Sequence, residues 1–313
     1  MIGYAARRLL AAVPTLFAVL TLAFVIVRIV PGDPAYAILG DHATPEAVAA
    51  LDAKLGLDRP ILVQYGAFLT RSLTGDFGRS MATGEPILRQ IAAALPPTIE
   101  LTLAAMVVGV ALGVPAGVWA ALHRNRGIDW AARLLSLTGL SFPVFVSGIF
   151  LLLAFAVHWP LFPVIGDLQP GDTLGNLRKL VLPAATLGTV MAAYVLRVTR
   201  SAMLQTMGED YIRTARAKGV RRRGVVWRHG LQNASLPVAT VVGLYVGILI
   251  GNSALTEIVF NRPGLGSVIV NALNQRDYTM LQALMVVYCV LIVVVNLLTD
   301  IAYSWLDPRV AEA

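Results

Sequence analysis

Long stretches that are nearly free of charge alternate with polar segments along the chain. A run of about twenty apolar residues is the length that an α-helix needs to cross the hydrocarbon core of a bilayer. Six such runs predict membrane-spanning helices at residues 9–30, 99–122, 134–158, 180–196, 236–256 and 280–299. The pattern therefore predicts an all-α integral membrane protein.

The composition supports lipid as the solvent of this chain. Of 313 residues, 57% are hydrophobic and 14% are charged, and the mean hydropathy is +0.71. The single cysteine, Cys289, lies in an apolar run, so an intrachain disulfide is excluded and a small buried side chain is expected. Residues 9–30 lack a small-residue cleavage pattern, which favours a retained anchor over a signal peptide.

Basic residues gather in the segments that lie on one side of the six predicted spans. The loop 197–235 carries most of them, whereas the segments 31–98 and 257–279 are close to neutral. The positive-inside rule places residues 1–8, the loop 197–235 and residues 300–313 in the cytoplasm. The same distribution disfavours nucleic acid as the reason for the net charge of +7.

The external segment 31–98 carries helix signals of its own. Thr44-Pro45-Glu46 offers an N-cap, a proline at the first helical position and an acid near the helix dipole, which predicts a helix to about Leu55. Asp58-Arg59-Pro60 begins a second amphipathic stretch, and a turn is expected at Gly75-Asp76-Phe77-Gly78. We expect a small external helical cap, with a solvated loop as the alternative.

Gly109, Gly113 and Gly117 follow one another at intervals of four residues in the second span. This spacing puts small residues on one helix face and lets a neighbouring helix approach closely. Tight helix packing is the expected role, and a pore-lining backbone is the alternative.

The loop from Arg197 to Pro237 carries the most informative pattern. Met207, Tyr211, Ile212 and Ala215 fall on one face of a helix that lies in a basic segment. Gly219 permits a turn, after which a second short helix is expected with Val225, Val226 and His229. An apolar helix face at the membrane surface needs a partner, either lipid headgroups or the groove of another protein.

The stretch Asp210–Gly219 (DYIRTARAKG), followed by His229, Asn233-Ala234 and Leu236-Pro237, resembles the cytoplasmic signature of permeases in the dipeptide, oligopeptide and nickel class of ABC importers. Further matches to this family are Arg8-Leu9-Leu10, Pro14-Thr15-Leu16, Pro31-Gly32-Asp33-Pro34, Gly75-Asp76-Phe77-Gly78, Pro97-Thr98-Ile99-Glu100-Leu101, Glu257-Ile258-Val259-Phe260, Pro263-Gly264-Leu265-Gly266, Arg276-Asp277 and Asp307-Pro308-Arg309. The matches span nearly the whole chain.

The resemblance implies the type I ABC importer permease fold with six transmembrane helices. It implies a multi-pass subunit of the bacterial inner membrane that translocates dipeptides or oligopeptides, with nickel or glutathione as alternative substrates. The implied partners are a second homologous permease, two ATP-binding subunits and an external substrate-binding protein. ATP and Mg would be bound by the partner subunits, and no cofactor is expected in this chain.

The resemblance also assigns the basic loop as a coupling helix that rests on an ATP-binding subunit. The residues assigned to this coupling are Asp210, Tyr211, Ile212, Arg213, Thr214, Ala215, Arg216, Lys218, Gly219 and His229. Tyr211, Ile212 and Ala215 would supply buried contacts with the ATPase. The basic side chains would match its charge or contact anionic lipid.

Candidates for the substrate path lie at the outer end of the fifth span. Gly251, Asn252 and Glu257 are found there, and a carboxylate in a water-filled cavity could attract the amino terminus of a peptide. The alternative is that Glu257 caps the span or pairs with an arginine such as Arg262.

The sequence offers no energy-converting or catalytic motif. It contains no GxxxxGK[ST] and no HExxH, its four histidines show no metal-ligand spacing, and no serine has the flanking glycines of a hydrolase elbow. An intramembrane enzyme is therefore a disfavoured alternative, and the family resemblance disfavours an ATPase-independent channel or carrier. We expect neither catalytic nor metal-binding residues.

Overall fold

The structure, a computed structural model, describes residues 2–29, 43–56, 58–164, 169 and 171–306. The Pro31-Gly32-Asp33-Pro34 and Asp307-Pro308-Arg309 motifs lie outside the described residues. Two compact units divide the chain, the first formed by residues 97–263 and 295–313 and the second by residues 2–96 and 264–294. Each unit is considered by itself.

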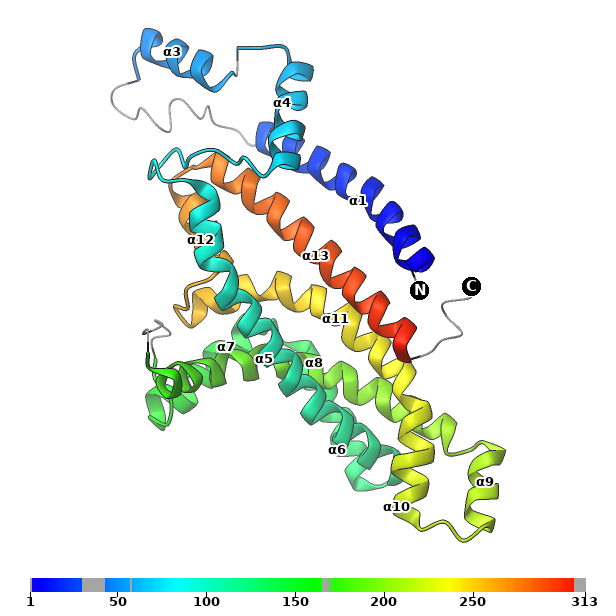
Figure 1. The fold of residues 1–313 in the computed structure, drawn as a ribbon. Helices are drawn as coiled ribbons and strands as arrows, with labels where there is room; N and C mark the ends of the chain where they lie inside the picture. Colours follow the sequence, from blue (N-terminus) through cyan, green and yellow to red (C-terminus); the bar gives the residue numbers. More distant parts are fainter. Residues whose placement is uncertain (1, 30–42, 57, 165–168, 170, 307–313) are drawn as a thin grey trace. The chain divides into compact units, whose positions relative to one another are not determined.

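Almost all of the described residues are helical (Figure 1). The first unit contains α6 (Gly127–Ser141), α7 (Val144–Leu152), η2 (Leu153–His158), α8 (Thr173–Thr206), α9 (Asp210–Ala217), α10 (Arg222–Gly224), η3 (Val225–Leu231) and α11 (Gln232–Val259). The second unit contains α1 (Ile2–Ile29), α3 (Pro45–Leu55), α4 (Ile61–Thr74) and α12 (Leu265–Asn274). Two helices belong partly to each unit, α5 (Ile87–Leu122) and α13 (Tyr278–Leu306).

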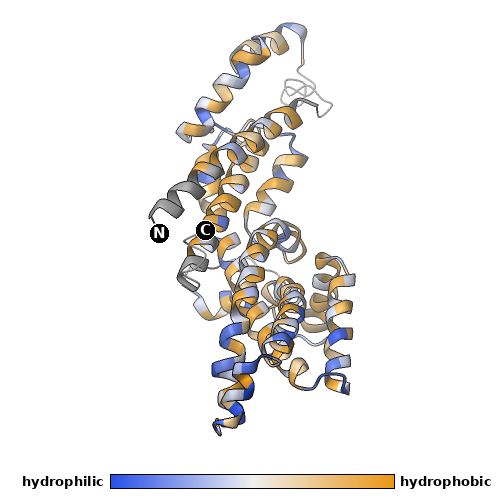
Figure 2. Cartoon of the chain, turned by 90° about the vertical axis from the view of Figure 1, so that its right-hand side faces the viewer, coloured by the Kyte–Doolittle hydropathy of each residue, from blue (hydrophilic) through white to orange (hydrophobic). Residues whose placement is uncertain are grey.

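Four helical segments in the described residues are long and apolar enough to cross a membrane. They are Ile87–Leu122, Thr173–Thr206, Arg222–Val259 and Tyr278–Thr299, and Figure 2 shows hydrophobic residues along most of their length. The pair formed by Gly127–Ser141 and Val144–His158 makes a fifth crossing if it is counted as one span. The predicted first span corresponds to α1, whose apolar stretch Val13–Ile26 is shorter, so the count of six stays a prediction.

The predicted third span, residues 134–158, is not a straight helix. Its helix stops at Ser141 and restarts at Val144, and the two arms are bent by 103°. Pro143 has no backbone N–H and restricts the residue before it, and Phe142 accordingly has extended backbone angles (φ −97°, ψ 139°). The helix therefore breaks where the sequence places proline.

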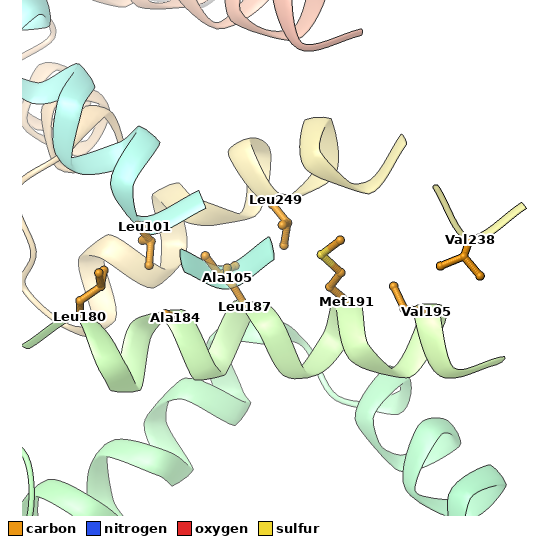
Figure 3. Packing of buried hydrophobic residues seen from close by; sticks show 9 residues of the cluster. All are labelled: Leu101, Ala105, Leu180, Ala184, Leu187, Met191, Val195, Val238 and Leu249. Carbon is orange, nitrogen blue, oxygen red and sulfur yellow. The ribbon is translucent and has the colours of Figure 1, made fainter. Parts of the chain in front are cut away.

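The core of the first unit lies between α5, α8 and α11. Figure 3 shows Leu101 and Ala105 of α5 beside Leu187 of α8, together with Leu249 of α11, and all four side chains are buried. This cluster joins helices that lie far apart in the sequence.

Glycine sets how closely α5 approaches α8. A Cβ added at Gly109, Gly113 or Gly117 would lie within 2.8 Å of Met191, Val195 or Thr199 respectively. The tight-packing interpretation of this glycine series is confirmed. The contacting residue numbers rise in the same order along α5 and along α8, so the two helices run in the same direction. The loops that follow them therefore emerge at the same end.

The second unit has a core of its own, formed by Ile87 and Ile91 with Leu265 and Leu284. At the start of α13 the Ser80 hydroxyl donates to Asp277 Oδ2 at 2.5 Å, and Asp277 Oδ1 accepts from the Met280 N–H at 3.0 Å. The carboxylate of Asp277 thus caps α13 and fixes the loop before α5 against it.

The predicted helical cap is present in the second unit. The Thr44 hydroxyl accepts from the Ala47 N–H at 3.2 Å at the start of α3, and Gly75 ends α4 in the left-handed conformation (φ 72°). The helix α4 packs on α1 through Tyr65, whose ring centroid lies 5.1 Å from that of Phe24. A docked helix, rather than a solvated loop, follows from these contacts.

Candidate coupling site and substrate path

In chain order, the short helix α9 follows α8 and precedes α10, η3 and α11, and Figure 1 shows it beside α10. The preceding helix α8 runs ten residues beyond the predicted end at residue 196 and stops at Thr206. A three-residue turn follows, so Met207 does not share a helix with Tyr211. The prediction of one continuous face from Met207 to Ala215 is therefore wrong, because the chain breaks at Gly208.

After α9 the chain reverses at Gly219, as predicted. This residue has φ +77°, a left-handed conformation that glycine adopts without a steric penalty. The Val220 N–H donates to the Ala215 carbonyl oxygen at 3.2 Å, which closes the turn. The short helix α10 and the π-helix η3 then return the chain against α9.

The apolar face of α9 is covered by its own chain. Ile212 is completely buried and Ala215 is 8% exposed, while Val225 and Val226 of the neighbouring η3 are also buried. The expectation that Ile212 and Ala215 offer their surfaces to an ATPase is thus corrected. The reversal at Gly219 folds η3 back onto α9, so these two side chains hold the loop together.

The outward surface of α9 and η3 carries aromatic and charged side chains. Tyr211 is 42% exposed and Trp227 is 51% exposed. The ion pair between Arg213 and Asp210, 3.3 Å apart, is also exposed and contributes little to stability. Figure 2 shows hydrophilic residues gathered in this segment, at the bottom of the view.

The other residues assigned to coupling are also placed on this segment. Thr214, Arg216, Lys218 and Gly219 are exposed, and His229 is half-buried on η3. The structure therefore brings the sequence-assigned residues into one α9–η3 hairpin, with Ile212 and Ala215 turned inward. Trp227 was not predicted, because a single aromatic residue among arginines follows no period.

A π-helix forms the base of this hairpin. The π-turn of η3 runs directly into α11, and Gly230 lies where a Cβ would meet Met203 and Met207 at 3.2 Å. Val226 also belongs to a buried cluster with Val118 of α5 and Met203 of α8. The hairpin is consequently attached to three long helices through apolar contacts.

The candidates for the substrate path do not lie on one face of α11. Gly251 is exposed with open space beside it, Asn252 is half-buried, and Glu257 is completely buried. Thr98 of α5 donates to Glu257 Oε1 at 2.7 Å. The idea that Glu257 faces a water-filled cavity is corrected, because its side chain is completely buried, and six helical positions also turn it well away from Gly251.

The alternative partner for Glu257 is also revised. The guanidinium of Arg262 is buried and its Nη2 lies 2.6 Å from Glu100 Oε2, which makes Glu100 its ion-pair partner. Glu257 is joined to Arg262 through the backbone, where the Arg262 N–H donates to the Glu257 carbonyl oxygen at 2.8 Å. These contacts tie the end of α11 to the start of the predicted second span.

Among the residues that the structure describes, no three His, Cys, Asp or Glu side chains are grouped so that they could hold a metal ion.

Two parallel glycine-packed helices, a short hairpin between two long helices and a bent helix pair define a class of membrane protein, the type I permease of ABC importers. The fold is similar to that seen in inward-facing conformations of the MetNI methionine ABC transporter, with a TM-score of 0.57 and 18% identity. That similarity covers 71% of this chain and 98% of the other.

The chain belongs to the family described as the inner membrane component of binding-protein-dependent transport systems, which it matches over residues 113–312. The N-terminal component of the same systems matches residues 1–102. The chain is therefore a multi-pass inner-membrane permease subunit of an ABC importer.

Curated relatives match along the full length. The chain is 38% identical to the dipeptide transport system permease protein DppB of Alkalihalophilus pseudofirmus over 331 residues. It is 39% identical to the glutathione transport system permease protein GsiC of Salmonella choleraesuis over 310 residues. Each comparison covers 99% of both chains.

Proposed function

We propose that this subunit translocates dipeptides and short oligopeptides across the inner membrane. The observation that carries this proposal is the full-length similarity to a dipeptide permease and, at nearly the same identity, to a glutathione permease. Both named substrates are small peptides, so the similarity favours a peptide over nickel. Glutathione itself stays within the proposed class.

The importer works with a second homologous permease, two ATP-binding subunits and an external substrate-binding protein. ATP and Mg bind to the ATP-binding subunits, and this chain is non-catalytic and holds no cofactor. The basic α9–η3 hairpin faces the cytoplasm together with both termini, in agreement with the positive-inside rule.

The coupling contact is made by the outward surface of the α9–η3 hairpin. Tyr211 and Trp227 are the exposed aromatic side chains of this surface, and aromatic residues are frequent anchors of protein interfaces. Thr214 and Lys218 lie on the same exposed side of the chain, and Arg213 adds positive charge. Ile212 and Ala215 act indirectly, because they hold the hairpin in shape.

The substrate path follows the exposed side of α11. Gly251 leaves open space there, and Asn252 offers a polar side chain next to it. Glu257 supports this end of α11 from behind through Thr98.

Reconstitution of the complete importer into vesicles tests the proposal. With ATP inside and the binding protein outside, we expect uptake of labelled dipeptide or glutathione that stops when ATP is omitted. The Tyr211→Ala variant should assemble normally and lose most of this uptake, while Ile61→Ala, which removes an exposed side chain of α4, should retain it.

Several results would contradict the proposal. Uptake without the ATP-binding subunits would indicate a channel or carrier. Chemical conversion of the peptide by the purified chain would indicate an enzyme. Uptake of nickel but not of peptide would leave the permease assignment intact and refute the proposed peptide substrate.

A further inference from the structure

In the first unit, a buried carboxylate joins α6 to α8 near the end of α8 that leads to α9. Asp129, in the first turn of α6, is completely buried. Its oxygens accept from Arg200 of α8 at two positions, Nε to Oδ1 at 2.5 Å and Nη2 to Oδ2 at 2.9 Å. This paired arrangement is the geometry in which a guanidinium and a carboxylate bind most specifically.

Two further groups complete the shell of this carboxylate. Arg133, one turn along α6, donates from Nε at 3.3 Å and from Nη2 at 2.7 Å. The backbone N–H of Asn125, in the α5–α6 loop, donates at 2.9 Å. Asp129 therefore accepts five hydrogen bonds that link the α5–α6 loop, α6 and α8.

Stability alone does not account for this arrangement. One buried carboxylate faces two guanidinium groups, of which Arg200 is 17% and Arg133 37% exposed, so the cluster carries a net positive charge at a partly exposed site. Buried ion pairs can often be replaced by apolar side chains of similar volume without loss of stability. Such a pair also fixes the register between two helices through directional hydrogen bonds.

The register matters here because of where α8 leads. Arg200 lies six residues before the end of α8 at Thr206, and α9 begins at Asp210. At a rise of about 1.5 Å per residue, Arg200 is only about 9 Å from the end of α8. The Arg200–Asp129 pair therefore lies close to the end of α8 from which α9 continues.

Elsewhere, the facing positions of α6 and α8 include small residues without charge. A Cβ on Gly139 of α6 would lie 3.6 Å from the Cβ of Ala193, and Gly148 of α7 lies against Thr186 of α8. Such smooth contacts allow one helix to slide along the other. The Asp129–Arg200 pair is the directional contact that resists this sliding.

We propose that Asp129 is a positioning residue for energy coupling, which locks α6 to α8 through Arg200 so that a displacement of α9 moves the bent α6–α7 pair together with α8. This inference rests on the proposed function of α9 as the ATPase contact. It concerns how motion leaves that contact, and it does not depend on which peptide is carried.

The test makes the same substitution at each of the two arginines that bind the Asp129 carboxylate, in the complete importer reconstituted in vesicles. Arg200→Gln removes the contact between the helices, and Arg133→Gln removes the contact within α6. For Arg200→Gln we expect ATP hydrolysis to continue and peptide uptake to fall, so that the ATP hydrolysed per peptide rises about tenfold, within the usual range of coupling energies. For Arg133→Gln this ratio should stay within about twofold of wild type.

A disulfide supplies a second, independent measurement. The 3.6 Å separation at Gly139 and Ala193 suits a disulfide, for which the two Cβ atoms lie about 3.5–4.5 Å apart. The double variant Gly139→Cys/Ala193→Cys, made with Cys289→Ala, should transport peptide under oxidising conditions and hydrolyse nearly as much ATP per peptide as the wild type. The same cross-link should restore coupling to Arg200→Gln, and reduction should abolish this rescue.

Three results would overturn the inference. Equal ratios in Arg200→Gln and Arg133→Gln would show that the cluster is only structural. Loss of transport on cross-linking the otherwise unchanged importer would show that α6 and α8 must separate, and this measurement stands even if Arg200→Gln does not assemble. Failure of the cross-link to rescue an assembled Arg200→Gln importer would also count against the lock. By contrast, absence of ATP-driven uptake in the wild-type importer would refute the proposed function itself.

Discussion

Substitution of Gly113 by alanine should weaken the contact between α5 and α8 more than the same change at Gly109. A Cβ at Gly113 would lie 2.8 Å from the carbonyl oxygen of Ala192 and 2.7 Å from the Cβ of Val195. At Gly109 the three nearest atoms belong to Met191: its Cγ and Sδ, which a rotamer change can move, and its Cβ at 2.8 Å, which a rotamer change leaves in place. A new rotamer of Met191 therefore relieves two of the three close contacts at Gly109, whereas the Ala192 carbonyl and the Val195 Cβ at Gly113 move only with their helix.

The magnitude follows from two opposed terms. Overpacking a close contact costs about 1–3 kcal/mol. Replacing glycine by alanine in a helix interior contributes about 0.5–1 kcal/mol in the stabilising direction. Gly251 of α11 has no atom within 4 Å of an added Cβ, so Gly251→Ala measures the stabilising contribution of alanine without any overpacking. The stability of Gly113→Ala should thus lie about 1–3 kcal/mol below that of Gly251→Ala.

Thermal unfolding of the purified chain in mild detergent measures these differences. With about 2–4 °C in Tm for each kcal/mol, Gly113→Ala should unfold about 2–12 °C below Gly251→Ala, with Gly109→Ala between them. If Gly113→Ala unfolds at the temperature of Gly251→Ala, the close approach of α5 to α8 is not a determinant of stability. If Gly109→Ala is the less stable of the two α5 variants, the distinction between side-chain and backbone neighbours is wrong.

Three further predictions concern the hairpin and the cap of α13. Ile212→Ala should destabilise the hairpin by about 2–5 kcal/mol and speed its cleavage by trypsin. Tyr211→Ala should leave the cleavage rate unchanged, and equal cleavage rates in the two variants would show that Ile212 is not a core residue. Gly219→Val places a branched side chain at φ +77° and should also speed cleavage, and an unchanged rate would mean that the turn tolerates it. Asp277→Ala removes both the α13 cap and the hydrogen bond from the Ser80 hydroxyl, so it should lower the apparent Tm more than Ser80→Ala does. A larger fall in Tm for Ser80→Ala would refute the capping role.

Local signals in the sequence predicted much of this fold. Helix α3 starts at Pro45 behind the Thr44 cap, and the chain turns at Gly75 and Gly219 as predicted. The glycine series of α5 was correctly interpreted as a packing face. These features depend on neighbouring residues in the chain, so the sequence carries them directly.

Features that depend on distant contacts were missed or misplaced. Periodicity identified Ile212 and Ala215 as one apolar face, but it could not show that η3, rather than another protein, covers that face. The Asp129–Arg200 pair joins residues 71 positions apart. One signal for it was available, since Asp129 is the single acid in the basic segment 123–133, and an isolated acid among arginines often has a partner among them.

The bend at Phe142–Pro143 limits how the third predicted span can cross a bilayer. Each arm has 15 residues and measures about 22 Å, so neither alone covers a hydrocarbon core of about 30 Å. Joined at 103°, the arms span about 28 Å end to end, and only if both lean by about 50°. A lean of this size gives the pair a wide footprint in the membrane plane. Counted as one span, the pair would have its elbow at mid-depth, where lipid tails offer no donors or acceptors to the interrupted backbone. In the assembled importer, the elbow must therefore lie against protein or water rather than against acyl chains.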